Sequence, residues 1–146
     1  RLTARYASTD ARFLQGTLPG SPFGFATNID IAGKYVPLVP MHKLNAGFVW
    51  DIRSGSRLTG TVTAASSQYM DNDEPNTLGT KIPSVVVADL KYADGFSWGR
   101  VALTVSNLFN QSYYSYAIRS QFVADRYAVY PLPGRTVSLS AELKAF

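Results

Sequence analysis

The sequence has 146 residues, a formal net charge of +4 and no cysteine, which excludes disulfide bonds, cysteine-ligated zinc and thiol catalysis. Charged residues make up only 16% of the chain, against roughly 25% in an ordinary soluble domain. Aromatic residues reach 13%. No apolar run approaches the ~18 residues that a membrane-spanning helix requires, so the sequence is not that of a helical membrane protein.

The first segment predicts one strand followed by a long loop. Residues 1–16 begin with alternating apolar and polar side chains, and this alternation fades near Asp10. A period of two is typical of a strand with one apolar face. Residues 17–40 hold much of the glycine and proline of the chain, so we expect a long loop there. Loops of this length are usually functional.

The middle of the chain predicts three more strands. Residues 41–52 and 57–70 alternate clearly and are separated by a short turn at 53–56. A polar loop at 71–81 follows, and then a strand over residues 84–92. The sequence Ala-Asp-Gly-Phe at 93–96 predicts the next short turn.

The closing segment predicts two strands joined by a long loop rich in tyrosine and arginine. The rising strand begins near Val101, and the returning strand begins near Val137, after Pro131, Pro133 and Gly134. One face of these strands and of the strand at 41–52 is apolar, and we expect it to face lipid. The predicted lipid-facing residues are Leu44, Phe48, Val101, Leu103, Val137, Leu139 and Leu143.

The chain is therefore predicted to be all-β, with six antiparallel up-and-down strands. Long loops and short turns alternate along it, which is typical of transmembrane barrels with short periplasmic turns and long extracellular loops. Six strands are too few to close, since bacterial barrels begin at about eight. The chain also starts at Arg1 without an initiator methionine or signal-like segment. We therefore expect further strands to precede it in a longer precursor.

Aromatic residues gather where the predicted strands end. Rings with a polar tip favour the two water–lipid boundaries of a membrane, although core aromatics of a soluble β-protein would give the same pattern. The predicted interface residues are Trp50, Phe96 and Trp98 near the short turns, and Tyr69, Tyr113 and Tyr114 near the long loops. Charges at Asp51, Asp89 and Glu142 are expected to face the lumen, because a charge in mid-bilayer costs about 2–4 kcal/mol at worst.

Several motifs resemble the C-terminal end of the TonB-dependent outer-membrane receptors. The segments that carry this resemblance are NLFNQSYY at 107–114 and YPLPGRTVSLSAELKAF at 130–146, with supporting segments at 36–50, 66–73 and 81–92 in the same order as in the receptors. One departure concerns Phe146. Such barrels end with a phenylalanine on the lipid-facing parity, whereas the apolar set here is odd-numbered, so either a bulge shifts the register or Phe146 is not the natural terminus.

The resemblance implies a bacterial outer-membrane transporter with a barrel of twenty-two strands and an N-terminal plug. Residues 1–146 would then be a partial barrel domain that supplies the last six strands, without the plug and the TonB box. Such receptors are not enzymes and hold no cofactor. They import iron–siderophore complexes, haem or cobalamin with energy delivered by TonB. The implied partners are therefore outer-membrane lipid and lipopolysaccharide, the rest of the barrel and plug, TonB, and an iron chelate or cobalamin-type ligand.

No motif predicts catalysis or a metal centre. His42 is the only histidine, which makes a zinc site built by this chain improbable, and no Gly-x-Ser-x-Gly elbow supports a hydrolase. Asp71, Asp73 and Glu74 crowd one loop, but Asn76 stands where an EF-hand needs glycine, so a solvated acidic loop is favoured over calcium. The basic residues are scattered, which argues against nucleic acid and suits lipopolysaccharide phosphates or an anionic ligand.

The last long loop combines cations, an amide and aromatic rings that could hold an anionic iron chelate through charge-assisted bonds and stacking. The candidate ligand-binding residues are Tyr116, Arg119, Gln121, Arg126 and Tyr127. An equally open interpretation is that these side chains only stabilise the loop. Two further hypotheses for the whole chain are an outer-membrane pore or adhesin-like barrel without a plug, and a soluble β-sandwich binding module.

Overall fold

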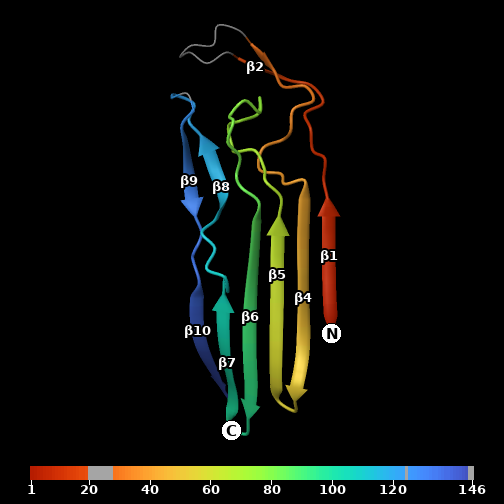
Figure 1. Cartoon of the computed structure of the whole chain (residues 1–146), viewed down its shortest axis with the longest axis vertical. Helices are drawn as coiled ribbons and strands as arrows, with labels where there is room; N and C mark the ends of the chain where they lie inside the picture. The colour runs from red at the N-terminus through yellow and green to blue at the C-terminus, as the bar shows by residue number, and fades with distance from the viewer. Residues whose placement is uncertain (20–27, 124, 145–146) are drawn as a thin grey trace.

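A computed structural model describes residues 1–19, 28–123 and 125–144, and its main feature is one antiparallel sheet (Figure 1). Six strands lie in the order β1, β4, β5, β6, β7, β10. Their bounds are β1 Leu2–Ser8, β4 His42–Arg53, β5 Ser56–Ala65, β6 Val85–Phe96, β7 Gly99–Ser106 and β10 Thr136–Leu143. The described part of the chain contains no helix long and apolar enough to cross a membrane. The prediction of six antiparallel up-and-down strands is confirmed.

The connections have the predicted asymmetry. The three long loops leave the sheet at one end, and the β4–β5 and β6–β7 turns lie at the other (Figure 1). Two of the loops contain hairpins that the sequence did not predict. The first long loop contains β2, Thr17–Leu18, paired with β3, Ile29–Asp30. The last contains β8, Tyr114–Arg119, paired with β9, Tyr127–Pro131.

The predicted turn at 93–96 is wrong. β6 runs on through Phe96, and the chain reverses at Ser97 and Trp98. Gly95 lies in the strand because it passes close to the neighbouring turn, where its N–H donates to the Gly55 carbonyl at 2.9 Å. A side chain on Gly55, whose φ is +89°, would meet the Gly95 carbonyl oxygen at 3.2 Å. Both glycines therefore serve the close approach of the β4–β5 turn to β6.

Two other strand boundaries also differ from the prediction. The strand expected over residues 1–16 ends at Ser8, and the one expected over 57–70 ends at Ala65. Ser66 still donates to the His42 carbonyl at 2.9 Å, and beyond it the chain leaves the sheet and pairs with loop segments, as in the isolated bridge between Gln68 and Ile82. The predicted terminal position of Phe146 and part of the loop at 17–40 lie outside the described residues.

The register brings every predicted lipid-facing side chain to the same face of the sheet. Residues opposite one another in an antiparallel pair point to the same side. Two rows illustrate this: Leu2–Phe48–Gly60–Leu90–Val105–Val137, and Trp50–Leu58–Tyr92–Leu103–Leu139. We call this surface the apolar face. Asp51, Asp89 and Glu142 have the opposite parity and lie on the polar face.

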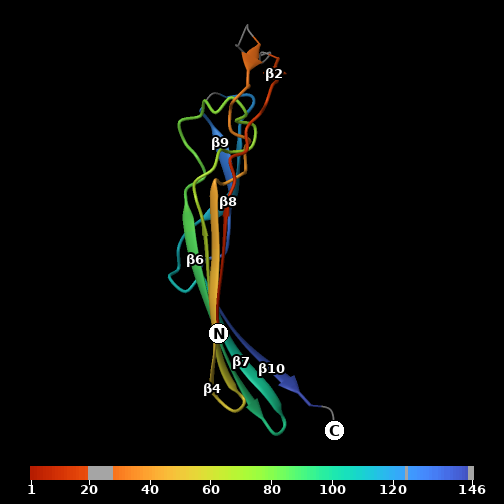
Figure 2. The ribbon, with the colours of Figure 1, turned by 90° about the vertical axis from the view of Figure 1, so that its right-hand side faces the viewer.

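Within the described ranges, no second sheet or helix covers the apolar face. Seen from the side, the six strands form a single twisted layer (Figure 2). Val137 is 65% exposed and Leu139 is 74% exposed, although both are large apolar residues. A soluble β-sandwich would bury these side chains under a second sheet. The fold therefore presents a wide apolar surface that needs an apolar environment or a partner.

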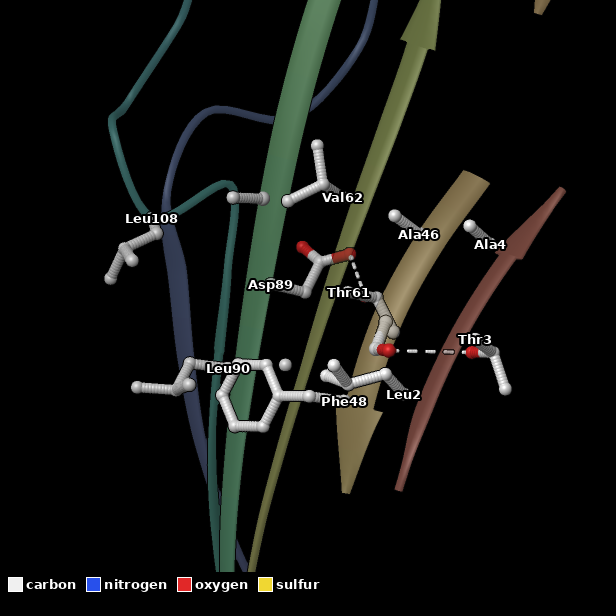
Figure 3. A pocket seen from close by; sticks show the side chains of 13 residues that line it. Leu2, Thr3, Ala4, Ala46, Phe48, Thr61, Val62, Asp89, Leu90 and Leu108 are labelled. Carbon is white, nitrogen blue, oxygen red and sulfur yellow. Dashed lines mark hydrogen bonds between the residues drawn. The ribbon is translucent and has the colours of Figure 1, made fainter. Parts of the chain in front are cut away.

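A shallow hollow lies across the neighbouring strands β1, β4, β5 and β6. Its volume is about 640 Å³, and small residues occupy its cross-strand positions, among them Ala4, Ala46, Gly60 and Ala88 (Figure 3). Phe48 fills part of the space left by Gly60, since a Cβ on Gly60 would lie 2.2 Å from the Phe48 ring. The large ring on β4 and the missing side chain on β5 thus form one complementary pair.

Replacement of Gly99 tests the pairing of the last two strands. A Cβ on Gly99 would lie 2.1 Å from the backbone oxygen of Glu142, so the β7–β10 ladder would have to separate. We expect Gly99→Ala to destabilise the folded protein by roughly 1–3 kcal/mol, measured by urea unfolding of the full-length protein in lipid vesicles. Gly79→Ala is the matched control, because a Cβ there meets nothing within 4 Å. Equal midpoints for the two variants would contradict the predicted contact.

Candidate functional site

The long loops fold onto one another at one end of the sheet. The segment after β5 lies beside β8, where the Asp71 N–H donates to the Ala117 carbonyl at 2.9 Å and the Arg119 N–H donates to the Asp71 carbonyl at 2.8 Å. This segment is thereby added to the β8–β9 hairpin in a parallel bridge. A small core forms beneath it from Met70, Leu78, Ile82 and Ala117, with Leu38 and Tyr114 packed against it. All three long loops thus contribute residues to one hydrophobic core.

A buried ion pair fastens the second long loop to the last one. The Asp73 side chain is 0% exposed, and its Oδ1 accepts hydrogen bonds from the N–H groups of Thr77 and Leu78 at 3.0 and 3.1 Å. Arg119 Nη1 donates to the same oxygen at 2.8 Å and also to the Thr77 hydroxyl at 2.7 Å. A carboxylate without access to water needs such partners, because an unpaired buried charge is strongly unfavourable.

A second carboxylate in this loop holds a tyrosine of β8. The Tyr116 hydroxyl donates to Asp71 Oδ2 at 2.7 Å. This hydrogen bond, with some burial, raises the pKa of the Tyr116 phenol above its usual value. The protonated phenol is the form that donates the bond, so the contact is complete below the ordinary pKa of tyrosine and is lost as the pH rises through the raised value.

The first long loop is attached through aromatic rings and one asparagine. Tyr35 stacks on Tyr69 with ring centroids 5.8 Å apart, while Arg12 lies 4.0 Å above the Tyr35 ring and Lys81 lies 4.1 Å from the Tyr69 ring centroid. The Asn76 side chain accepts from the Tyr35 N–H at 2.7 Å and donates to the Tyr35 carbonyl at 3.0 Å. The two rings and two cations form one column across both loops.

The Asn-Leu-Phe-Asn turn joins the end of β7 to the segment before β10. Asn107 is 3% exposed and donates to the carbonyls of Gln111, at 2.8 Å, and Pro133, at 3.3 Å. Asn110 Oδ1 accepts from the Arg135 N–H at 2.9 Å. Both asparagines have positive φ, which asparagine tolerates better than most residues. The two motifs that carried the sequence resemblance are thus hydrogen-bonded to each other.

The structure separates the predicted ligand-binding residues into two groups. Tyr116 and Arg119 are occupied by the contacts with Asp71 and Asp73. Gln121, Arg126 and Tyr127 are exposed and lie at the far end of the β8–β9 hairpin. This arrangement favours a loop-stabilising role for the first group and leaves the second group accessible to a ligand.

The predicted interface aromatics likewise differ in their surroundings. Phe96 and Trp98 stack at the short-turn end with centroids 5.2 Å apart, and Trp50 is exposed at the same end. At the long-loop end, Tyr69 belongs to the column with Tyr35, and Tyr114 packs against the loop core. The assignment of these rings and of Tyr113 to a membrane interface stays a prediction.

The acidic loop does not form a metal-binding cluster among the described residues. Asp71 and Asp73 are each turned toward a different residue of β8, as set out above. Asn76 has a φ of +57° and uses its side chain to hold the first loop. Sequence reasoning missed the structural roles of Asp73, Asn76 and Asn107, although an asparagine next to a turn is a signal for positive φ.

Comparison with solved structures shows what kind of protein has this fold. No protein-family model matches the sequence, and no curated protein matches it. The match to the siderophore receptor PiuA from Acinetobacter baumannii covers 96% of this chain and 19% of the receptor chain, with a TM-score of 0.77 and 18% sequence identity. The match to the ferric yersiniabactin uptake receptor FyuA from Yersinia pestis covers 82% of this chain and 20% of the receptor chain, with a TM-score of 0.65 and 20% sequence identity. This chain has the fold of a part of such receptors.

A third match agrees. The match to the ferric citrate transporter FecA in its unliganded form covers 77% of this chain and 18% of the transporter chain, with a TM-score of 0.61 and 24% sequence identity. The chain therefore spans about a fifth of the length of the solved structures it matches. The resemblance predicted from the sequence is confirmed at the level of the fold. The strand number of a complete barrel stays a prediction.

Removal of the Arg119 side chain tests the contact between the second and last loops. Arg119→Ala leaves the buried Asp73 carboxylate without its counter-charge, and we expect loop docking to weaken by roughly 2–3 kcal/mol. Hydrogen exchange at the amides of Asp71 and Arg119 reports this docking, because both amides donate across the junction. Arg126→Ala, at an exposed position of the same hairpin, should leave both amides protected. Unchanged protection in Arg119→Ala would refute the role of the ion pair.

Proposed function

We propose that this chain is the last part of the barrel of a TonB-dependent transporter in a bacterial outer membrane. The observation that carries the proposal is the uncovered apolar face of a single six-stranded sheet, with all long loops at one end. Hydrocarbon tails would satisfy this face, and strands elsewhere in the barrel would pair with the outer edges of β1 and β10. The fold match to two receptors and a transporter supports the same assignment.

In this proposal the two ends of the sheet have different tasks. The strands present apolar side chains to lipid and polar ones, including Asp89 and Thr61, to the lumen. The joined loops form part of the extracellular surface that captures an iron chelate. The exposed Gln121, Arg126 and Tyr127 offer an amide, a guanidinium and a phenol to an anionic ligand. Import itself would depend on a plug and on TonB, and the protein would catalyse no reaction.

Growth assays of the full-length protein test the transport proposal. The gene would be expressed in a strain without its own iron receptors, and growth would be measured on single ferric chelates, haem and cobalamin. We expect growth on one ligand class, lost when TonB is deleted. Growth that does not need TonB would contradict the proposal and favour a pore without a plug.

Arg126→Ala should raise the ligand concentration needed for half-maximal uptake, by about threefold to tenfold for one charge-assisted bond.

The face assignment makes a separate prediction for β10. Leu139 pairs with Leu103 on the apolar face, and the adjacent Ser138 pairs with Thr104 on the polar face. Leu139→Arg places a charge toward lipid and is expected to cost up to about 2–4 kcal/mol, so less protein should assemble in the membrane. Ser138→Arg should assemble normally and change only uptake. Equal insertion of both variants, measured as the fraction of folded protein in isolated outer membranes, would argue against the assignment.

A further inference from the structure

A small pocket lies where the first long loop meets the loop ends of β4 and β5. Its volume is about 210 Å³, and seven of its lining residues carry polar or aromatic groups: Tyr35, His42, Ser66, Ser67, Gln68, Tyr69 and Lys81. The Ser66 N–H donates to the His42 carbonyl at 2.9 Å, and the Ser66 hydroxyl oxygen accepts from the His42 N–H at 3.1 Å. These bonds extend the β4–β5 ladder and hold both side chains at the pocket wall.

The pocket is suited to an anion. Lys81 contributes an ammonium group that takes part in no salt bridge among the described residues, and none of the residues that line the pocket is an aspartate or glutamate. The serine hydroxyls can donate hydrogen bonds. The Tyr6 hydroxyl oxygen lies 2.9 Å from His42 Nδ1. When this hydroxyl donates to Nδ1, the neutral imidazole carries its proton on Nε2, and this N–H becomes a further donor. A phosphate group accepts bonds from such separate donors through several oxygens.

The pocket borders the apolar face. His42 pairs with Ser8, two residues beyond the Tyr6–Leu44 pair, so its side chain points to the same side of the sheet as Leu44. The Tyr6 ring stacks on the imidazole with centroids 6.0 Å apart. Exposed apolar side chains, including Leu44 and Val86, begin next to this point on β4 and β6. A molecule with a phosphate in the pocket could therefore lay an acyl chain along the sheet.

We propose that this pocket binds the phosphate of a lipid headgroup in the outer leaflet. The inference rests on the proposed function, because the pocket lies at headgroup level only if the apolar face is in lipid. Lys81 supplies the charge, His42 and the two serines supply hydrogen bonds, and the Tyr35 and Tyr69 rings form a wall that also holds Lys81 in place. The bound lipid would join the first two long loops to the membrane surface.

Lipid binding to the purified full-length protein tests the proposal. Native mass spectrometry in detergent micelles would compare dioleoyl phosphatidic acid with dioleoylglycerol, which has the same acyl chains and no phosphate. We expect selective retention of phosphatidic acid, weakened about tenfold in Lys81→Gln because one charge-assisted bond is lost. Lys81→Arg should retain binding, since it keeps the charge and a donor. Lys43→Gln is the matched control, because Lys43 is next to His42 but has the opposite parity.

Several outcomes would overturn the proposal. Equal retention of dioleoylglycerol, or the same loss in Lys43→Gln as in Lys81→Gln, would remove the phosphate site. Displacement of the lipid by millimolar inorganic phosphate, with Lys81-dependent phosphate binding of equal affinity, would assign the pocket to a soluble anion instead. The proposed transport function is tested separately, by TonB-dependent growth, so its failure can be told apart from a failure of lipid binding. A wild-type protein that inserts and transports but shows no Lys81-dependent lipid binding would contradict only this inference.

Discussion

The register of the six-stranded sheet is the constraint on which the other features depend. Because side chains alternate, one fixed set of pairs places Phe48, Leu90 and Val137 together and directs Asp89 to the opposite side. A slip of one residue in any strand would exchange these sets. In a bilayer such a slip would bring charged groups into hydrocarbon, so the solvent itself would select the register. The orientation of the loops then follows from the strand ends.

The two ends of the molecule are stabilised by different interactions. Along the strands the described contacts are mainly backbone hydrogen bonds between neighbours, and the large apolar side chains remain uncovered. At the long-loop end, burial resumes around Met70 and Ile82, and Asp73 and Arg119 form a pair within it. In the proposed membrane setting, water would surround that end and compete for every polar group, so the loops would need a core and shielded hydrogen bonds to hold one arrangement. Along the strands, lipid would surround the apolar side chains and make such a core unnecessary.

Local patterns in the sequence were sufficient for the strand centres and for the apolar face. The period of two is a property of each strand by itself, so Leu44, Leu103 and Leu139 could be assigned without knowledge of their neighbours. The turn at 93–96 failed because Gly95 serves a contact with Gly55, which lies forty residues earlier in the chain. The β8–β9 hairpin escaped prediction because its strands are short, and a register shift near Tyr114 interrupts the alternation.

The candidate site was less predictable than the fold, because its residues acquire their roles from other loops. Nothing near Arg119 in the sequence indicates that its charge is neutralised by Asp73, forty-six residues away. Composition alone therefore grouped Arg119 with Arg126, although one is committed to internal contacts and the other is exposed. The same logic separates Lys81 from Arg12, which pairs with Asp10 at 2.8 Å. In a loop surface of this kind, a cation is available for an external anion when no carboxylate of the chain has already paired with it.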